Sequence, residues 1–352
     1  MRSSREPGSD GDVVDAIRDL GAGKDLGETR TVRLIGEIMD GALTPAQTAA
    51  LLVALRMKGE TEAEIAGAAR ALRAKMTPVA TPDRIVVDTC GTGGDGLQTF
   101  NISTAAAFVV AGAGLCVGKH GNRSVSSRCG SADVLEALGV PFSSDPEELA
   151  ACLDRHGMVF LYAPSLHPAM SHAAKTRREI GVPTILNLAG PLANPAGVRH
   201  QVVGVPEASL APVLARVLGR LGAVCAWVVT GEGGMDELTT TGVNRIAVWS
   251  DGRVQERTVD AAALGLPRAR PEDLRGGDSL ENASRIEAIL RGRPGPDRDI
   301  VLLNAAAALV VGQKAPDLGS GLARAASSID SGAAHGVLEA VRRPGAGREG
   351  TA

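Results

Sequence analysis

The sequence predicts an α/β protein with a small all-helical N-terminal domain and a large domain whose helices flank a mostly parallel central sheet. Residues 11–75 show helical periodicity without a strand, and after residue 84 short apolar runs alternate with helix-like segments. Such alternation is typical of helices packed on a parallel sheet. The 352 residues, 44% of them hydrophobic, are enough to build both domains.

Four amphipathic segments form the expected helical domain. They cover residues 12–20, 29–39, 44–57 and 60–74. Thr44 stands before a proline at the first helical position, so it is a predicted N-cap. Thr61 stands three residues before Glu64, which is the spacing of a capping box.

Changes in composition predict the domain boundaries. The Pro-containing segment 76–83 separates the helical pattern from the alternating one. In chain order we expect a disordered tail (1–10), a helical domain (11–83) joined by helices around 165–180, an α/β domain (84–342) and a second disordered tail (343–352).

The larger domain begins with a predicted buried strand at 84–88, a β-branched run bounded by turn signals. Further strands are predicted at 115–119, 158–162, 184–188, 201–205 and 224–230, and a small β excursion within 246–275. Helices are predicted at 132–138, 169–180 and 210–221, and two or three closing helices within 300–311 and 319–341. In such a fold, ligands bind beyond the carboxyl ends of the strands.

Composition excludes several functional classes. A net charge of −3 and 2% aromatic residues argue against a broad basic nucleic-acid surface or a base-stacking platform. The polar N-terminus lacks a secretory h-region, and no apolar run reaches the roughly 20 residues of a spanning helix. The five cysteines, Cys90, Cys116, Cys129, Cys152 and Cys225, are scattered and odd in number. We therefore expect free thiols in a soluble cytoplasmic protein.

The first segment that carries chemistry follows the first predicted strand. Gly91 to Gly96 have GxGxxG spacing, but no acidic residue lies between Gly96 and Ala132, so the dinucleotide fingerprint is incomplete. The glycines would bring backbone N–H groups close to an anion. Ser103 or Thr104 is the predicted cap of the next helix, whose N-terminus would bind phosphate. A plain strand–turn–helix is the alternative.

The second segment is a basic loop over 119–128, after the next predicted strand. Lys119, Arg123 and Arg128 supply positive charge, while Asn122 and three serines supply donors. A second helix N-terminus follows at 129–131. A solvated basic loop is the alternative, but two anion-binding loops in adjacent βα units favour a polyphosphorylated ligand.

The third segment places Asp236 and Glu237 just after the strand predicted at 224–230. Mg²⁺ prefers one or two carboxylates together with phosphate oxygens and water. Asp236 and Glu237 could supply such ligands, with the Ser103 hydroxyl as a further one, although a solvated turn is the alternative.

The fourth segment holds Arg177 and Arg178 near the end of a predicted helix. Either arginine could serve the helix dipole, and one that points inward could bind a substrate carboxylate. His120 and His167 are interpreted as packing residues rather than catalysts. The sequence shows neither a Ser–His–Asp arrangement nor the His/Cys spacing of a metal site.

Together these segments resemble the anthranilate phosphoribosyltransferases. The matching motifs lie within 88–240 and read DTCGTGGDG, TFNIST, KHGNRSVSSRCGSADVLEALG, HPAM, RREIGVPT, NLAGPLANP and GMDELTT. The resemblance implies a nucleoside-phosphorylase-like fold and a homodimer formed through the helical domain. It also implies transfer of phosphoribose from phosphoribosyl pyrophosphate (PRPP) to the amine of anthranilate, which yields N-(5-phosphoribosyl)anthranilate and pyrophosphate in tryptophan biosynthesis.

The resemblance also implies roles for individual residues. The PRPP positions are Gly91, Gly94, Asp95, Thr99, Asn101, Ile102, Ser103, Thr104, Lys119, His120, Gly121, Asn122, Arg123, Ser124, Val125, Ser126, Ser127 and Ser131. The anthranilate positions are Gly91, Asn122 and Arg177, and the magnesium ligands are Ser103, Asp236 and Glu237, with two Mg²⁺ ions per monomer. We expect no general base, since Lys119 and Mg²⁺-bound pyrophosphate would stabilise the leaving group.

Three rival interpretations stay open at the level of sequence. A pyrimidine nucleoside phosphorylase would share the fold but use phosphate in place of PRPP. A non-catalytic paralogue would bind nucleic acid, which the net charge disfavours. An enzyme with the same chemistry could accept another aminobenzoate.

Overall fold

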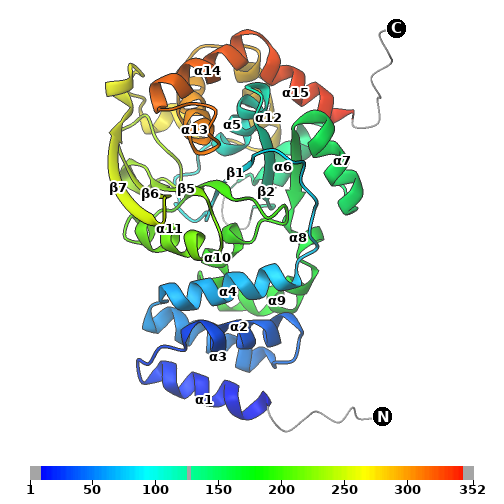
Figure 1. The fold of residues 1–352 in the computed structure, drawn as a ribbon, viewed down its shortest axis with the longest axis vertical. Helices are drawn as coiled ribbons and strands as arrows, with labels where there is room; N and C mark the ends of the chain where they lie inside the picture. Colours follow the sequence, from blue (N-terminus) through cyan, green and yellow to red (C-terminus); the bar gives the residue numbers. More distant parts are fainter. Residues whose placement is uncertain (1–8, 125–127, 344–352) are drawn as a thin grey trace. The chain divides into compact units, whose positions relative to one another are not determined.

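The computed structural model describes residues 9–124 and 128–343, which form two compact units. Among the described residues, a helical unit contains residues 9–77 together with Pro164–Ala193, and an α/β unit contains the rest, which lie within residues 78–163 and 194–343 (Figure 1). Helix α1 begins at Ser9, inside the predicted N-terminal tail. Residues 1–8 and 344–352 of the predicted tails lie outside the described residues.

Long and short helices build the helical unit. They are α1 (Ser9–Gly21), α2 (Gly27–Met39), α3 (Pro45–Lys58), α4 (Glu62–Lys75), α8 (Ala163–Leu166), α9 (Ser171–Ile180) and α10 (Ile185–Ala189), with 3₁₀ turns at Pro168–Met170 and Gly190–Leu192. The two predicted caps are confirmed, because the Thr44 hydroxyl accepts from Gln47 N at 3.2 Å and that of Thr61 from Glu64 N at 3.3 Å.

Helices α2 and α4 approach closely because α4 carries Gly67. A Cβ at Gly67 would lie 2.6 Å from the carbonyl oxygen of Glu28. Next to this contact Glu64 is fully buried, and its carboxylate accepts from Leu26 N at 3.0 Å and from Lys58 Nζ at 2.9 Å. The buried charge is therefore both paired and hydrogen-bonded, as burial requires.

One predicted element of this unit is wrong. Residues 184–188 were expected to form a strand, but α10 is a helix in whose first turn Thr184 N donates to Asn187 Oδ1 at 3.0 Å. A short apolar segment does not distinguish a buried strand from a buried helix. The Thr184–Asn187 spacing was the signal that favoured the helix.

His167 in the helical unit makes stability depend on pH. The residue is 7% exposed, and burial lowers the pKa of His167 to about 4. Below the unfolded value near 6.5, the unfolded chain binds a proton that the folded chain does not, so stability falls as pH drops. The His167 contribution should fall by about 1.3 kcal/mol between pH 7.5 and 5.5.

Urea unfolding at both pH values measures the free energy of unfolding of the native chain and of His167→Gln. The variant should lack this part of the pH dependence. His172→Gln, a change at an exposed histidine of the same unit, is the control and should keep it. An equal pH dependence in native chain and His167→Gln would contradict the assignment.

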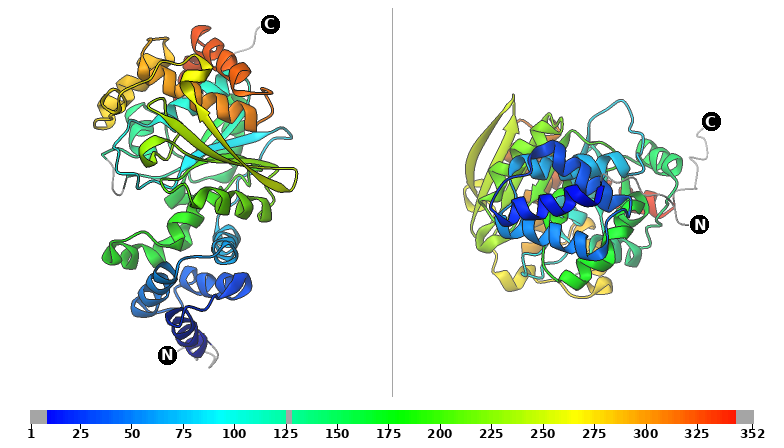
Figure 2. Two further views of the ribbon diagram at one scale, coloured as in Figure 1. Left: turned by 90° about the vertical axis from the view of Figure 1, so that its left-hand side faces the viewer. Right: turned by 90° about the horizontal axis from the view of Figure 1, so that it is seen from below.

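The α/β unit is organised around one seven-stranded sheet in the order β3-β2-β1-β4-β5-β6-β7. The strands are β1 (Val86–Gly91), β2 (Cys116–Gly121), β3 (Met158–Tyr162), β4 (His200–Gly204), β5 (Cys225–Thr230), β6 (Val243–Ser250) and β7 (Arg253–Asp260). Neighbours among the first five pair in parallel, whereas β6 and β7 add an antiparallel hairpin at one edge (Figure 2). The predicted α/β class with a mostly parallel sheet is confirmed.

Helices cover the sheet. They are α5 (Ile102–Gly112), α6 (Ser131–Ala137), α7 (Pro146–His156), α11 (Leu210–Arg220), α12 (Ser279–Leu290), α13 (Pro296–Val311), α14 (Leu318–Asp330) and α15 (Ala333–Arg342), with 3₁₀ turns at Glu232–Gly234, Ala261–Leu264 and Pro271–Leu274. Figure 1 shows α5 and α12 to α15 gathered on one side of the sheet, with α11 against β5 and β6 on the other. Periodicity did not predict α7 or α12.

Within residues 9–124 and 128–343, every helix is too short or too polar to cross a membrane.

Candidate functional site

The strand order reverses between β1 and β4, which are neighbours in the sheet although residues 92–199 separate them in the chain. Such a switch point leaves a crevice beyond the carboxyl ends of the strands, where ligands of α/β proteins bind. The two strands end at Gly91 and Gly204, which pair with each other. The polar loops described below lie at this edge.

Asp236 lies directly against both terminal glycines. A Cβ at Gly91 would strike the Asp236 carboxylate, and a Cβ at Gly204 would overlap the Asp236 carbonyl. Only glycine at both strand ends therefore lets the segment after β5 fold across the switch point. Asn304 of α13 fixes the other end of this segment, since its Oδ1 accepts from Leu238 N at 3.0 Å.

The glycine-rich loop after β1 wraps around the same carboxylate. Gly93, Gly94 and Gly96 all have positive φ, at 70°, 83° and 71°, which favours glycine at these positions. Gly93 N donates to Asp236 Oδ2 at 2.8 Å, and Asp95 lies close enough to influence the ionisation of Asp236. The loop and the distant acidic residue therefore form one structure.

The N-terminus of α5 completes the cluster, although not with the predicted cap. Asn101 is the N-cap residue and makes no side-chain capping bond, so the prediction that Ser103 or Thr104 caps this helix is wrong. Ser103 lies inside the first turn, where its N–H donates to Glu237 Oε1 at 3.0 Å. The hydroxyl of Thr104 is buried and has no hydrogen-bond partner within the described part of the chain.

The acidic residues of this cluster fit a divalent cation. Burial raises the pKa of Asp236, and repulsion from Glu237 and Asp95 raises it further. Burial also raises the pKa of Glu237, while Lys119 opposes that change. The Oδ2 atom of Asp95 is buried and accepts no hydrogen bond from any described residue. Such crowded oxygen ligands, partly unsatisfied, are the donor set that Mg²⁺ prefers.

Lys119 lies beneath this cluster and is 1% exposed. Its Nζ donates to the Thr89 carbonyl at 2.6 Å and to Ser103 Oγ at 3.3 Å. Burial lowers the pKa of Lys119, and the charges of Asp88 and Glu237 oppose this effect. The ammonium group therefore lies between β1 and the N-terminus of α5, next to the predicted metal ligands.

A buried polar network supports Lys119 from the sheet side. Asp88 is fully buried and accepts from His120 N at 3.1 Å, from Asn194 Nδ2 at 2.8 Å and from Gln201 Nε2 at 3.2 Å. Three donors from separate parts of the chain thus satisfy the hydrogen-bonding capacity of the buried Asp88 carboxylate. Asn194 lies in the NLAGPLANP motif and Gln201 begins a predicted strand, but neither was assigned a role from the sequence.

The second loop is organised by Asp133, which sequence reasoning did not select. Its carboxylate accepts from Gly130 N at 2.9 Å, from Ser124 N at 3.1 Å and from Arg123 Nη1 at 2.9 Å. Arg123 also reaches Glu136 Oε2 at 2.8 Å, so its guanidinium is bound to helix α6 in this structure. The Gly130–Asp133 spacing of a helix start was the available signal.

The α/β unit holds nearly all of the predicted site residues. The segment from the end of β1 to the first turn of α5 carries Gly91, Gly94, Asp95, Thr99, Asn101, Ile102, Ser103 and Thr104, and the segment from the end of β2 to the start of α6 carries Lys119, His120, Gly121, Asn122, Arg123, Ser124 and Ser131. The side chain of Ile102 is buried in the core, so only its backbone can face a ligand. Val125, Ser126 and Ser127 lie outside the described residues.

Arg177 belongs to the helical unit, on α9. Its Nη2 donates to Asn187 Oδ1 at 3.3 Å, and burial lowers the pKa of Arg177. The next residue, Arg178, is exposed. The sequence did not distinguish the two arginines, whereas in the structure Arg177 is partly buried and hydrogen-bonded and Arg178 is exposed.

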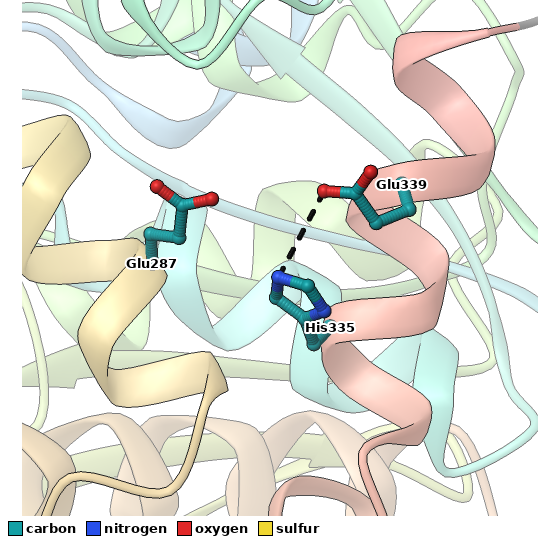
Figure 3. A group of neighbouring side chains, drawn as sticks. All are labelled: Glu287, His335 and Glu339. Carbon is teal, nitrogen blue, oxygen red and sulfur yellow. Dashed lines mark ion pairs between the residues drawn. The ribbon is translucent and has the colours of Figure 1, made fainter.

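A second group of possible metal ligands lies away from these loops. Glu287 of α12 and His335 and Glu339 of α15 point toward one another, with one ligand atom from each within 4.8 Å of the others (Figure 3). However, Arg342 Nη1 already lies 3.2 Å from Glu287 Oε1 and 2.5 Å from Glu339 Oε1. A guanidinium thus occupies the position of a cation, and this group acts as an ion-pair cluster that joins two helices.

Two family models match the chain. The glycosyl transferase family, a/b domain, matches residues 83–335, and the glycosyl transferase family, helical bundle domain, matches residues 14–76. The first match covers most of the chain and includes every strand of the sheet.

Individual relatives agree with the family models. The chain is 55% identical to an anthranilate phosphoribosyltransferase from Anaeromyxobacter dehalogenans over 93% of this chain and 96% of the relative. It resembles the crystal structure of the Thermus thermophilus enzyme of that name with a TM-score of 0.89 and 41% identity, covering 94% and 99% of the two chains. A Saccharomyces cerevisiae enzyme of that name, in complex with PRPP and Mg, matches with a TM-score of 0.86 and 27% identity over 96% and 98%.

Proposed function

Because the chain belongs to the anthranilate phosphoribosyltransferase family, we propose that it transfers phosphoribose from PRPP to the amine of anthranilate and releases pyrophosphate, a step of tryptophan biosynthesis. The observation that carries this proposal is the meeting of Ser103, Asp236 and Glu237 beside a glycine-rich loop at the switch point of the sheet. A polyphosphate with its magnesium is the ligand that such an arrangement would bind.

PRPP is proposed to lie across the two loops of the α/β unit. The backbone N–H groups around Gly94 and at the start of α5 would bind phosphate oxygens, and the loop from Lys119 to Ser131 would bind the rest of the ligand. The unsatisfied Thr104 hydroxyl supports this placement, since a buried donor favours a ligand that accepts its hydrogen bond.

Magnesium is proposed to bind through Ser103, Asp236 and Glu237, with two ions per monomer. When bound, it supplies positive charge to the departing pyrophosphate. Lys119 adds a fixed positive charge at the same point, because its Nζ contacts Ser103 Oγ. The amine of anthranilate is a neutral nucleophile that needs positioning more than deprotonation, so the proposal contains no general base.

Anthranilate is proposed to contact Gly91, Asn122 and Arg177, with the Arg177 guanidinium binding its carboxylate. Arg177→Ala should then raise KM for anthranilate by at least about tenfold, because one charge-assisted hydrogen bond to the substrate is lost. KM for PRPP should change little. Steady-state kinetics with each substrate varied in turn measures both constants. Arg178→Ala, a change at the exposed neighbour, is the matched control. A rise confined to KM for PRPP would show that the assignment is wrong.

Cytoplasmic location and a homodimer formed through the helical unit complete the proposal. The odd number and scattered positions of the five cysteines support a reducing compartment. Sedimentation at micromolar concentration tests the dimer.

The decisive test of the function is loss of anthranilate fluorescence after addition of PRPP and Mg²⁺ to the folded protein. Omission of PRPP, or of Mg²⁺ with a chelator present, should abolish the loss. Phosphate-dependent cleavage of uridine or thymidine, with no consumption of anthranilate, would instead identify a nucleoside phosphorylase.

A further inference from the structure

A chain of hydrogen bonds runs from helix α12 to both loops of the candidate site. Gly277 N donates to Asn282 Oδ1 at 2.9 Å, and Asn282 Nδ2 donates to Asn101 Oδ1 at 3.1 Å. Asn101 Nδ2 in turn donates to the carbonyl of Cys129 at 3.1 Å. Asn101 directly precedes α5 and Cys129 lies just before α6, so the chain joins the segments that lead into both helix N-termini.

The backbone before α12 holds the same loop in place. Gly276 N donates to the Gln98 carbonyl at 2.8 Å, and Phe100 N donates to the Leu274 carbonyl at 3.1 Å. Between these bonds Thr99 and Arg275 form an antiparallel bridge. The segment 274–276 therefore pairs with residues 98–100, and α12 packs on α5 and α6 (Figure 1).

Asn282 is 2% exposed and has no surface with which to touch a ligand. Its amide oxygen and nitrogen are both used in the chain, and the amide also reaches the thiol of Cys129. Removal of the amide would leave buried partners on Asn101 and Gly277 unpaired, which costs more than the net strength of one hydrogen bond. Asn282 therefore acts on the site through other residues.

Asn101 correspondingly connects the two loops. Its side-chain oxygen accepts from Asn282 and its side-chain nitrogen donates to Cys129 O, so both ends of the amide are engaged within the protein. With the link intact, the residues directly before α5 and those directly before α6 have one relative geometry before a ligand arrives. Loops ordered in advance bind more tightly because less conformational entropy is lost on binding.

We propose that Asn282 is a positioning residue for PRPP: through Asn101 it holds the loop before α5 and the loop before α6 in register for one ligand. The inference rests on the proposed function, since it names PRPP as that ligand. Asn282 lies outside the motifs by which the sequence resembles its family, which end at residue 240.

Kinetics of Asn282→Ala tests the proposal. KM for PRPP should rise about tenfold, which corresponds to one buried hydrogen bond, while kcat and KM for anthranilate change less than about twofold. The isosteric Asn282→Asp keeps the acceptor for Gly277 N and loses the donor to Asn101. It should therefore also raise KM for PRPP. It is the variant to measure if Asn282→Ala does not fold.

Ser328→Ala is the matched control. Ser328 is 3% exposed, and its hydroxyl donates to the Val109 carbonyl at 2.8 Å, at the opposite end of α5. Loss of this bond should lower the melting temperature with KM for PRPP unchanged. If Ser328→Ala and Asn282→Ala raise that KM equally, or if neither Asn282 variant raises it, the proposal is overturned.

A double-mutant cycle separates positioning from general destabilisation. Because Asn282 acts through Asn101, the double variant Asn101→Ala/Asn282→Ala should have the KM for PRPP of Asn101→Ala alone. If the increases in KM for PRPP of the two single variants multiply in the double variant, Asn282 and Asn101 act independently, which contradicts the proposal. If the native chain binds PRPP by calorimetry but does not consume anthranilate, the proposed function fails, and PRPP dissociation constants then test Asn282 independently.

Discussion

Replacement of Asp236 and Glu237 together by alanine is expected to lower kcat/KM by about a thousandfold at millimolar Mg²⁺, because the departing pyrophosphate loses its main source of positive charge. The melting temperature should change much less than activity. Removal relieves the burial and mutual repulsion that raise the pKa of Asp236, but it also leaves Gly93 N and Ser103 N without their acceptors. A large loss of activity with a small change in stability is therefore expected.

The measurement is initial-rate kinetics with a Mg²⁺ titration, combined with thermal unfolding. Glu147 and Glu148 are an adjacent, exposed pair in the first turn of α7, and their double alanine variant is the matched control. Near-normal turnover by the Asp236/Glu237 variant at ordinary Mg²⁺ would exclude their proposed metal role.

Gly204→Ala should abolish most activity although the residue offers no side chain to a ligand. The new Cβ would overlap the Asp236 carbonyl, so the segment that carries Asp236 and Glu237 must shift away from the glycine-rich loop. A displacement of about 1 Å at such a site costs on the order of a hundredfold in rate. The change should appear in kcat/KM, with a smaller loss of stability.

Gly336→Ala is the control for this prediction. Gly336 lies in α15 of the same unit, where a Cβ would meet nothing within 4 Å, so alanine should be neutral or slightly stabilising. Full activity of Gly204→Ala would show that the segment tolerates displacement and that its position at the switch point does not matter for catalysis.

The sequence predicted the fold class because its patterns are local. Alternating apolar runs and helical segments marked the parallel strands, and the spacing at Thr44 and Thr61 marked two helix starts. The prediction at 184–188 was wrong because a short apolar run fits either structure, and the Thr184–Asn187 contact that starts the helix is a weak sequence signal. The cap of α5 was wrong because Ser103 lies inside the first turn, where Glu237 binds its N–H.

The candidate site could be predicted only in its loops. Glycines, basic residues and paired acids after strands are visible in the sequence, and the structure brings Ser103, Asp236 and Glu237 together, while their roles toward ligands stay predictions. The roles of the supporting residues were not visible. Asn282 and Asn194 have partners, Asn101 and Asp88, that lie 181 and 106 positions away.

The contact between Ser103 and Glu237 joins residues that are 134 positions apart. A ribosome must therefore release β1 to β5 before the proposed metal ligands can meet, and a nascent chain that stops short of β5 has both loops but lacks Asp236 and Glu237. Ligand binding can then stabilise only the finished sheet, by mass action on the folded state. In a cell, the supply of substrate would thus protect completed chains from degradation and leave truncated ones exposed.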